Sequence, residues 1–171
     1  MKKLLLLLAV PAILFFVSCG GSKKDAPVSI PGMMEVTLKI NGNTLSIMVP
    51  DSTKGKMEMV EQSWGATEIK VGKEFQLSIS EGEGDIALMK SDIAGNDVNK
   101  FKRFLKDEPG LLFWESEITE PEFHFYIVEK VGTVSYLIED IKDEHFNEKG
   151  AQAMIDAAKT LKVKEVAKPN S

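Results

Sequence analysis

The stretch EVTLKINGNTLSIMV (residues 35–49) decides most about the fold of this 171-residue chain. Apolar and polar residues alternate on both sides of Asn41-Gly42, so Val36, Leu38 and Ile40 share one face of an extended segment. Asn-Gly between two alternating runs is the strongest short-range hairpin signal, because both turn positions need positive φ. The sequence therefore predicts an antiparallel β-hairpin at the start of the domain.

Further segments downstream have the period-two pattern of strands. Phe75, Leu77 and Ile79 alternate cleanly with polar residues. The other predicted strands are residues 57–62, 69–71, 86–90, 111–118, 123–129 and 133–138, the last two joined through Gly132 as a second hairpin.

Two segments have the three- and four-residue spacing of helices. Gly95-Asn96-Asp97 is a helix-start signal before Val98, Phe101 and Leu105, and Pro109-Gly110 ends the run, so a short helix is predicted over residues 97–108. Residues 147–162 form a longer amphipathic helix, with Ala151, Met154, Ala158 and Leu161 on one face.

This order predicts an α+β fold: an antiparallel sheet built from hairpins, with a short middle helix and an amphipathic C-terminal helix packed on it. In element order the chain is loosely similar to Mog1/PsbP-type α+β folds. That resemblance implies a sheet with a terminal helix, and it carries no site residue.

The N-terminus joins Met1-Lys2-Lys3 to an unbroken apolar stretch over residues 4–17. A positive start and an apolar run of this length are typical of a secretory signal peptide, and the run is short for a membrane span. Phe16-Val17-Ser18-Cys19 resembles the lipobox of bacterial lipoproteins, with Phe16 in place of the usual Leu, and Cys19 is the only cysteine. The resemblance implies cleavage between Ser18 and Cys19, a lipid on the Cys19 thiol, and an acyl chain such as palmitate on the new amino terminus.

Residues 1–18 are therefore the predicted signal peptide and residues 19–32 the lipidated N-terminus and flexible tether, rich in Gly, Ser, Lys and Pro. A single domain is predicted over residues 33–165, followed by a tail at 166–171. The resemblance implies anchoring in bacterial cell-envelope lipid through acylated Cys19. Gly20, where inner-membrane lipoproteins of enterobacteria have Asp, favours the outer membrane, and both its periplasmic and its surface face stay open.

The net charge is −5, and loss of Lys2 and Lys3 with the signal peptide makes the mature chain more acidic. A nucleic-acid binder is thereby excluded as the expected class. A single cysteine excludes an internal disulfide, a cysteine-based zinc site and a redox pair.

The chain has two histidines, His124 and His145. Alternation places His124 on the face of Tyr126 and Val128, which favours an inert, hydrogen-bonded histidine in an interior strand over a general base or ligand in a cleft. His145 ends the acidic stretch 139–145. That stretch matches no calcium-binding loop, so a solvated connection is favoured over a cation site.

Common active-site motifs are absent: there is no nucleophile elbow, no His-Glu-x-x-His and no phosphate-binding loop. We therefore assign no catalytic residue, metal ligand or cofactor. Trp64, beside a glycine and outside any clear alternation, is the residue most expected to be exposed and to form part of a partner surface.

Two classes of function remain. The favoured one is a lipid-anchored, non-catalytic binding or accessory module whose partner is an unidentified protein or envelope component. The alternative is an envelope hydrolase or metal-dependent enzyme that uses His124, His145 and nearby carboxylates. Geometry separates them, because the enzyme hypothesis fails if the histidines lie far apart and no cleft joins them to carboxylates.

Overall fold

The N-terminal hairpin forms as its alternating pattern predicts. The computed structural model describes residues 30–98 and 100–164, in which β1 (Met33–Ile40) pairs antiparallel with β2 (Asn43–Pro50). Asn41 and Gly42 make the turn with φ of 47° and 86°, the left-handed conformation that these two residue types adopt most readily. The predicted signal peptide, Cys19, most of the tether and the tail lie outside the described residues.

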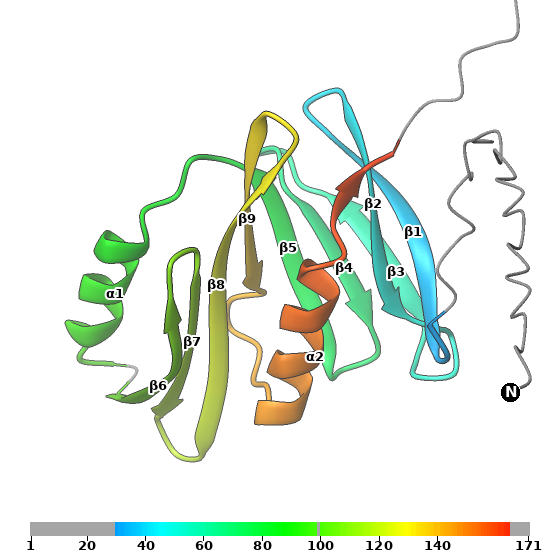
Figure 1. Cartoon of the computed structure of the whole chain (residues 1–171). Coiled ribbons are helices and arrows are strands. Elements are labelled where there is room, and N and C mark those ends of the chain that lie inside the picture. Colours follow the sequence, from blue (N-terminus) through cyan, green and yellow to red (C-terminus); the bar gives the residue numbers. More distant parts are fainter. Residues whose placement is uncertain (1–29, 99, 165–171) are drawn as a thin grey trace, which may run out of the picture.

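The hairpin is followed by eight more strands and two helices in the described part of the chain (Figure 1). In chain order they are β3 (Met57–Glu61), β4 (Thr67–Val71), β5 (Phe75–Glu81), α1 (Ile86–Ala94), β6 (Lys100–Glu108), β7 (Leu111–Glu117), β8 (Pro121–Val131), β9 (Val134–Asp140), α2 (Glu148–Ala158) and β10 (Lys162–Val163).

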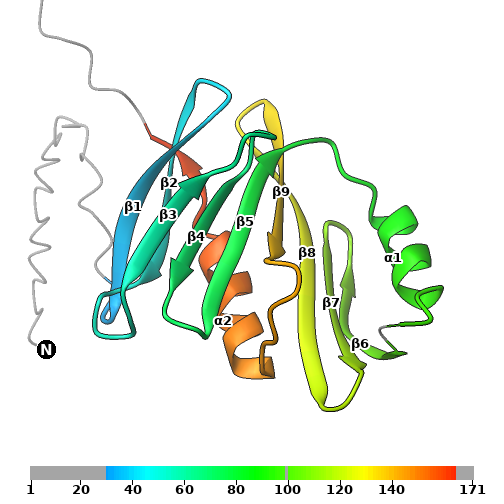
Figure 2. The same cartoon turned by 180° about the vertical axis from the view of Figure 1, so that it is seen from behind.

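The strands form two antiparallel sheets (Figures 1 and 2). Seven strands make the larger sheet in the order β3-β4-β5-β9-β8-β7-β6, and β1, β2 and β10 make the smaller one. The chain is therefore a sheet-rich antiparallel fold with two helices. The hairpin predicted across Gly132 is confirmed as β8–β9.

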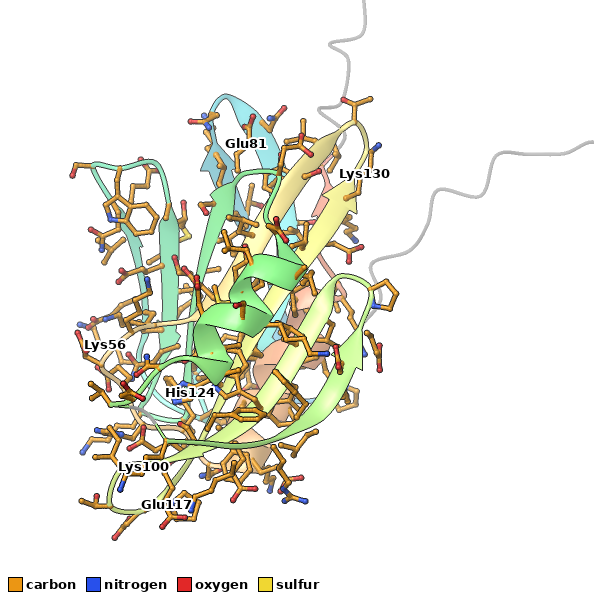
Figure 3. All side chains as sticks on the ribbon, turned by 90° about the vertical axis from the view of Figure 1, so that its left-hand side faces the viewer. Lys56, Glu81, Lys100, Glu117, His124 and Lys130 are labelled. Atoms are coloured by element: carbon orange, nitrogen blue, oxygen red, sulfur yellow. The ribbon has the colours of Figure 1, made fainter. Side chains whose placement is uncertain are left out.

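Alternation along the strands gives the larger sheet two faces. We call inner the face covered by α2 and the smaller sheet, where Leu77, Phe125 and Ile138 are fully buried in the main hydrophobic core. The opposite, outer face carries a second apolar cluster that includes Leu112, Tyr126 and Ile93 of α1. Figure 3 shows α1 lying over this face. The two helices therefore pack on opposite faces of one sheet.

The strand predicted over residues 86–90 is wrong, because these residues begin α1. Asp85 caps the helix by accepting the backbone N–H of Leu88 at 2.9 Å. Ile86, Met89 and Ile93 have the three- and four-residue spacing of a helix face, and all three belong to the outer-face cluster. The cap and the packing together favour a helix here, although the short apolar run in the sequence suggested a strand.

The helix predicted over residues 97–108 is also wrong, because residues 100–108 form β6. The register between β6 and β7 shifts between Phe101 and Arg103 and again between Phe104 and Lys106. Such bulges insert an extra residue, so Phe101 and Phe104 both pack in the outer-face cluster although they are three residues apart. Leu105, whose four-residue spacing from Phe101 suggested a helix, packs instead against the main core on the inner face, so the two residues do not share one helical face.

The C-terminal helix is confirmed, with Asn147 as its N-cap accepting the N–H of Gly150 at 2.9 Å. It ends at Ala158, before the predicted limit, and the chain continues into β10. Neither helix in residues 30–98 and 100–164 has the length and apolarity needed to cross a membrane.

Candidate functional site

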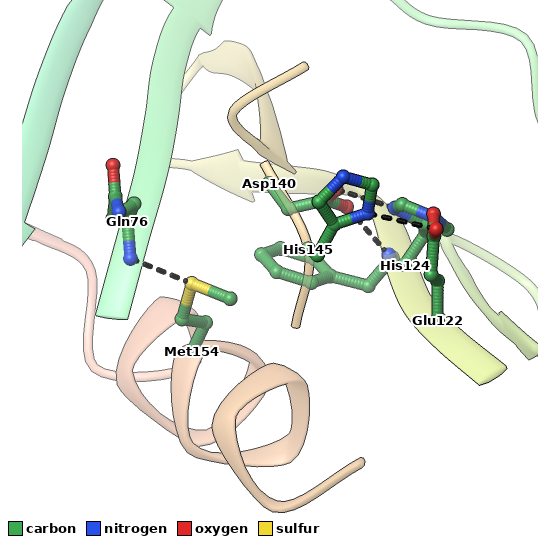
Figure 4. A network of polar contacts seen from close by, with 7 residues as sticks. Gln76, Glu122, His124, Asp140, His145 and Met154 are labelled. Carbon is green, nitrogen blue, oxygen red and sulfur yellow. Dashed lines mark hydrogen bonds and ion pairs between the residues drawn. The ribbon is translucent and has the colours of Figure 1, made fainter. Parts of the chain in front are cut away.

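Two histidines and two carboxylates form a connected network beside the end of β9 (Figure 4). Asp140 is the last residue of β9. The pairing of β9 with β8 ends one residue earlier, where Glu139 is opposite Tyr126. Its Oδ1 accepts the backbone N–H of Phe125 at 2.8 Å, and its Oδ2 lies 2.7 Å from Nδ1 of His124. The Asp140 carboxylate thus continues the hydrogen bonding between the strands and fixes the imidazole ring.

Glu122 lies on the other side of the His124 ring. Its Oε2 is 3.6 Å from His124 Nε2, too long for a hydrogen bond, and its Oε1 is 2.7 Å from Nδ1 of His145. His124 Nε2 is shielded from solvent and has no hydrogen-bond partner among the described residues. The side chain of His145, between β9 and α2, is 70% exposed. The two histidines are therefore brought together through one carboxylate.

The two carboxylates control the charge of His124. Burial lowers the pKa of His124, but the hydrogen bond with Asp140 and the charges of Asp140 and Glu122 raise that pKa by more, so it lies above the ordinary histidine value. The ring therefore carries a proton more readily than a free histidine does.

A cavity of about 450 Å³ lies next to this network, between α1 and the outer face of the sheet. This volume falls in the range of small-molecule sites. Its lining comes from α1 and the turn after it, from β7, β8 and β9, and from the segment after β9: Met89, Asp92, Ile93, Asn96, Trp114, His124, Phe125, Glu139, Asp140, Lys142 and Asp143. β8 is an interior strand and His124 is partly buried and hydrogen-bonded, as predicted; the expectation that His124 lies outside a cleft is wrong, because its side chain also lines this cavity.

The Trp114 indole forms an aromatic wall of this cavity. Trp114 and His124 are paired across β7 and β8, and their ring centroids lie 5.5 Å apart with the planes tilted by 33°. On the same side, burial raises the pKa of Glu139, the Lys142 ammonium opposes that rise, and Asp140 adds to it. The cavity therefore joins an apolar, aromatic wall to ionisable groups.

A second cavity of about 200 Å³ shares Glu139, Asp140 and Lys142 with the first and extends to Trp64. Trp64 is 63% exposed, which confirms the exposure predicted from its position beside a glycine. Its place in a partner surface remains a prediction.

Sequence reasoning found His124 and His145 but missed most of their neighbours. The proximity of Glu122 to His124 could have been predicted from the sequence, because Glu122 stands two residues before His124 on the same face of one strand. Asp140 belongs to the acidic stretch already singled out, although nothing local shows that its carboxylate accepts a backbone N–H of another strand. The place of Asp92 beside the site could not have been predicted, since the segment before it was predicted to be a strand and is part of α1.

Within the part of the chain that the structure describes, no group of three or more His, Cys, Asp or Glu side chains is arranged to hold a metal ion. Comparison of the sequence and structure with protein-family models, curated proteins and solved structures gave no match.

Proposed function

We propose that this protein is a lipid-anchored bacterial cell-envelope protein, in the outer membrane, whose domain binds a ligand or partner without transforming it. The observation that carries the binding role is the cavity between α1 and the outer face, because it has the volume of a ligand site and combines aromatic and charged walls.

The state of His124 supports binding over catalysis. A general base must place a ring nitrogen within about 3 Å of the proton that it removes. Asp140 contacts Nδ1 of His124, so Nε2 is the nitrogen left to act as a base, and Nε2 is shielded from solvent next to Glu122. The described cavity lining also contains no Ser, Thr or Cys that His124 would activate as a nucleophile.

The alternative is an envelope hydrolase or metal-dependent enzyme based on His124, His145 and nearby carboxylates. It is favoured by the 2.7 Å contact between His124 and Asp140 and by the joining of both histidines through Glu122. The geometric criterion that would have removed it, widely separated histidines without a cleft, is not met. It therefore stands as the second candidate.

Anchoring at Cys19 is supported by the lipobox-like residues at the N-terminus and fits the placement of the cavity. The chain enters the described domain next to β1, and β1 and α1 lie at opposite ends of the molecule (Figures 1 and 2). A tether attached at the β1 end would leave the α1 end, with its cavity, directed away from the lipid surface.

The anchor is tested with Cys19→Ser in the full chain, expressed in a bacterial host that is fed a labelled fatty acid. We expect loss of the label and accumulation of the uncleaved precursor. A fully labelled Cys19→Ser protein would contradict the lipoprotein assignment.

The binding role is tested by restoring a deletion strain with two variants whose folding is checked by circular dichroism. Asp92→Arg, at an exposed position of α1, should fill the cavity and behave like the deletion. The variant His145→Gln, at a position outside the lining of both cavities, should keep the function. A folded His145→Gln variant that behaves like the deletion would instead support the enzyme.

A further inference from the structure

We infer that the cavity under α1 takes an organic cation, an ammonium or guanidinium group on an apolar stem. This inference rests on the proposed binding function and names the chemistry of its ligand.

Carboxylates outnumber cations around the cavity. Asp92 and Asp143 are exposed at its rim, and neither makes an ion pair with any described residue; the same holds for Glu139. Lys142 is the one lysine or arginine in the described lining, and His124, whose pKa is raised, is a second basic group there. The four carboxylates of the lining still outnumber these two groups, and those of Asp92 and Asp143 have no ion-pair partner among the described residues, so a cationic group is attracted to the cavity and an anion is repelled.

The apolar walls fit the stem and the face of such a cation. Met89 and Ile93 of α1 face Trp114 across the outer-face cluster. An ammonium or guanidinium group is attracted to the face of an indole within about 6 Å, and the attraction is larger where water is excluded. Packing against the His124 ring holds the Trp114 indole in place for this contact.

The two cavities make the site elongated. Glu139, Asp140 and Lys142 line both, so the path from Trp114 continues past them to the exposed Trp64. A ligand with a second cationic or polar group further along its stem is held along this path. Two sources supply that chemistry: a free polyamine, or an arginine or lysine side chain of a partner polypeptide.

The test is a titration of the full chain, purified in a non-ionic detergent, monitored by tryptophan fluorescence. Trp64→Phe is introduced so that emission reports Trp114 alone, the other tryptophan of the chain. The probes are spermidine, N-acetylarginine amide and the uncharged N-acetylcitrulline amide. We expect saturable binding of a cationic probe and none of the citrulline probe; a higher affinity for spermidine indicates the free polyamine, and a higher affinity for the arginine probe the side-chain source.

Two charge-neutralised variants locate the binding. Asp92→Asn with Asp143→Asn should weaken cation binding by about tenfold, the effect of two partly exposed charges. Glu61→Gln with Glu81→Gln removes the same charge from exposed positions outside both cavities and should change nothing. Equal weakening by both pairs would show non-specific attraction and overturn the site.

Other outcomes separate the ligand class from the proposed function. If no probe binds, or if the citrulline probe binds equally well, the inference that the ligand is a cation is overturned. Loss of function in Asp92→Arg would then still support a binding cavity. Cation binding in the purified chain together with full function of Asp92→Arg would contradict the proposed function and leave the cation site standing.

Discussion

The two faces of the seven-stranded sheet are closed in different ways. On the inner face, α2 and the smaller sheet exclude water from an apolar core in which Leu77, Ile138 and Met154 are fully buried. On the outer face, α1 covers only part of the strands and leaves the cavity beside His124. The buried polar side chain of Glu122 also lies on this side.

This difference separates stability from binding in the molecule. Apolar burial contributes roughly 25 cal/mol per Å² and is largest where the surface is closed on all sides, as at α2. Polar groups in a half-closed site contribute less, because each must first lose its contacts with water. We therefore expect changes on the inner face to cost folding free energy and changes near the cavity to alter mainly charge and binding.

The largest effect is expected for Met154→Asp on the inner face. Met154 is fully buried, and its sulfur lies 3.1 Å from the backbone nitrogen of Gln76 (Figure 4). An unpaired carboxylate there should lower the free energy of unfolding by about 4 kcal/mol or more. Urea denaturation measures the change, with Ala153→Asp at an exposed position of the same helix as the control. Equal midpoints for wild type and Met154→Asp would show that α2 is not docked.

A smaller loss is expected for Asp140→Ala, at the junction of the two faces. This substitution removes the acceptor of the Phe125 N–H and the partner of His124, at a cost of about 2–3 kcal/mol. Asp140→Asn retains an oxygen for the Phe125 N–H and should cost less. The same denaturation experiment ranks the two variants; identical losses would mean that the backbone hydrogen bond contributes nothing measurable.

The inner face was largely predictable from the sequence, because alternation and helical spacing are local patterns. Val36, Leu38 and Ile40 indicated the first hairpin, and Ala151 and Met154 indicated the packed face of α2. The strand order of the larger sheet was not predictable, since β5 pairs with β9 across more than fifty residues. No short sequence window contains that information.

The outer face was less predictable for two physical reasons. Phe101 and Leu105 have the spacing of a helix but pack on opposite faces of the bulged strand β6, and the cap at Asp85 outweighs the strand-like run that follows it. The site was found only in part, because contacts such as Asp140 with the Phe125 N–H depend on two strands meeting in space. The lipid anchor at Cys19 stays a prediction.

A pH effect on stability is expected from His124. Its pKa is raised in the folded protein, so the stabilisation is fully present below the unfolded value of about 6.5 and is lost as pH rises through the folded pKa. Each unit of pKa difference corresponds to about 1.4 kcal/mol. The free energy of unfolding should therefore fall above pH 6.5, and this fall should be smaller in His124→Gln. An unchanged pH dependence in that variant would assign the effect to other groups.

The smallest effect on stability is expected for Trp64→Ala, which tests whether the exposed indole that lines the second cavity contributes to the stability of the fold. Trp64 is 63% exposed, so removing its indole should change the free energy of unfolding by no more than about 0.5 kcal/mol. Trp114→Ala, on the half-buried wall, should cost more because its ring packs against His124 and the outer-face cluster. Denaturation of both variants gives the comparison. If Trp64→Ala lowered the free energy of unfolding as much as Trp114→Ala, the second cavity would be part of the folded core and not an open extension of the first cavity.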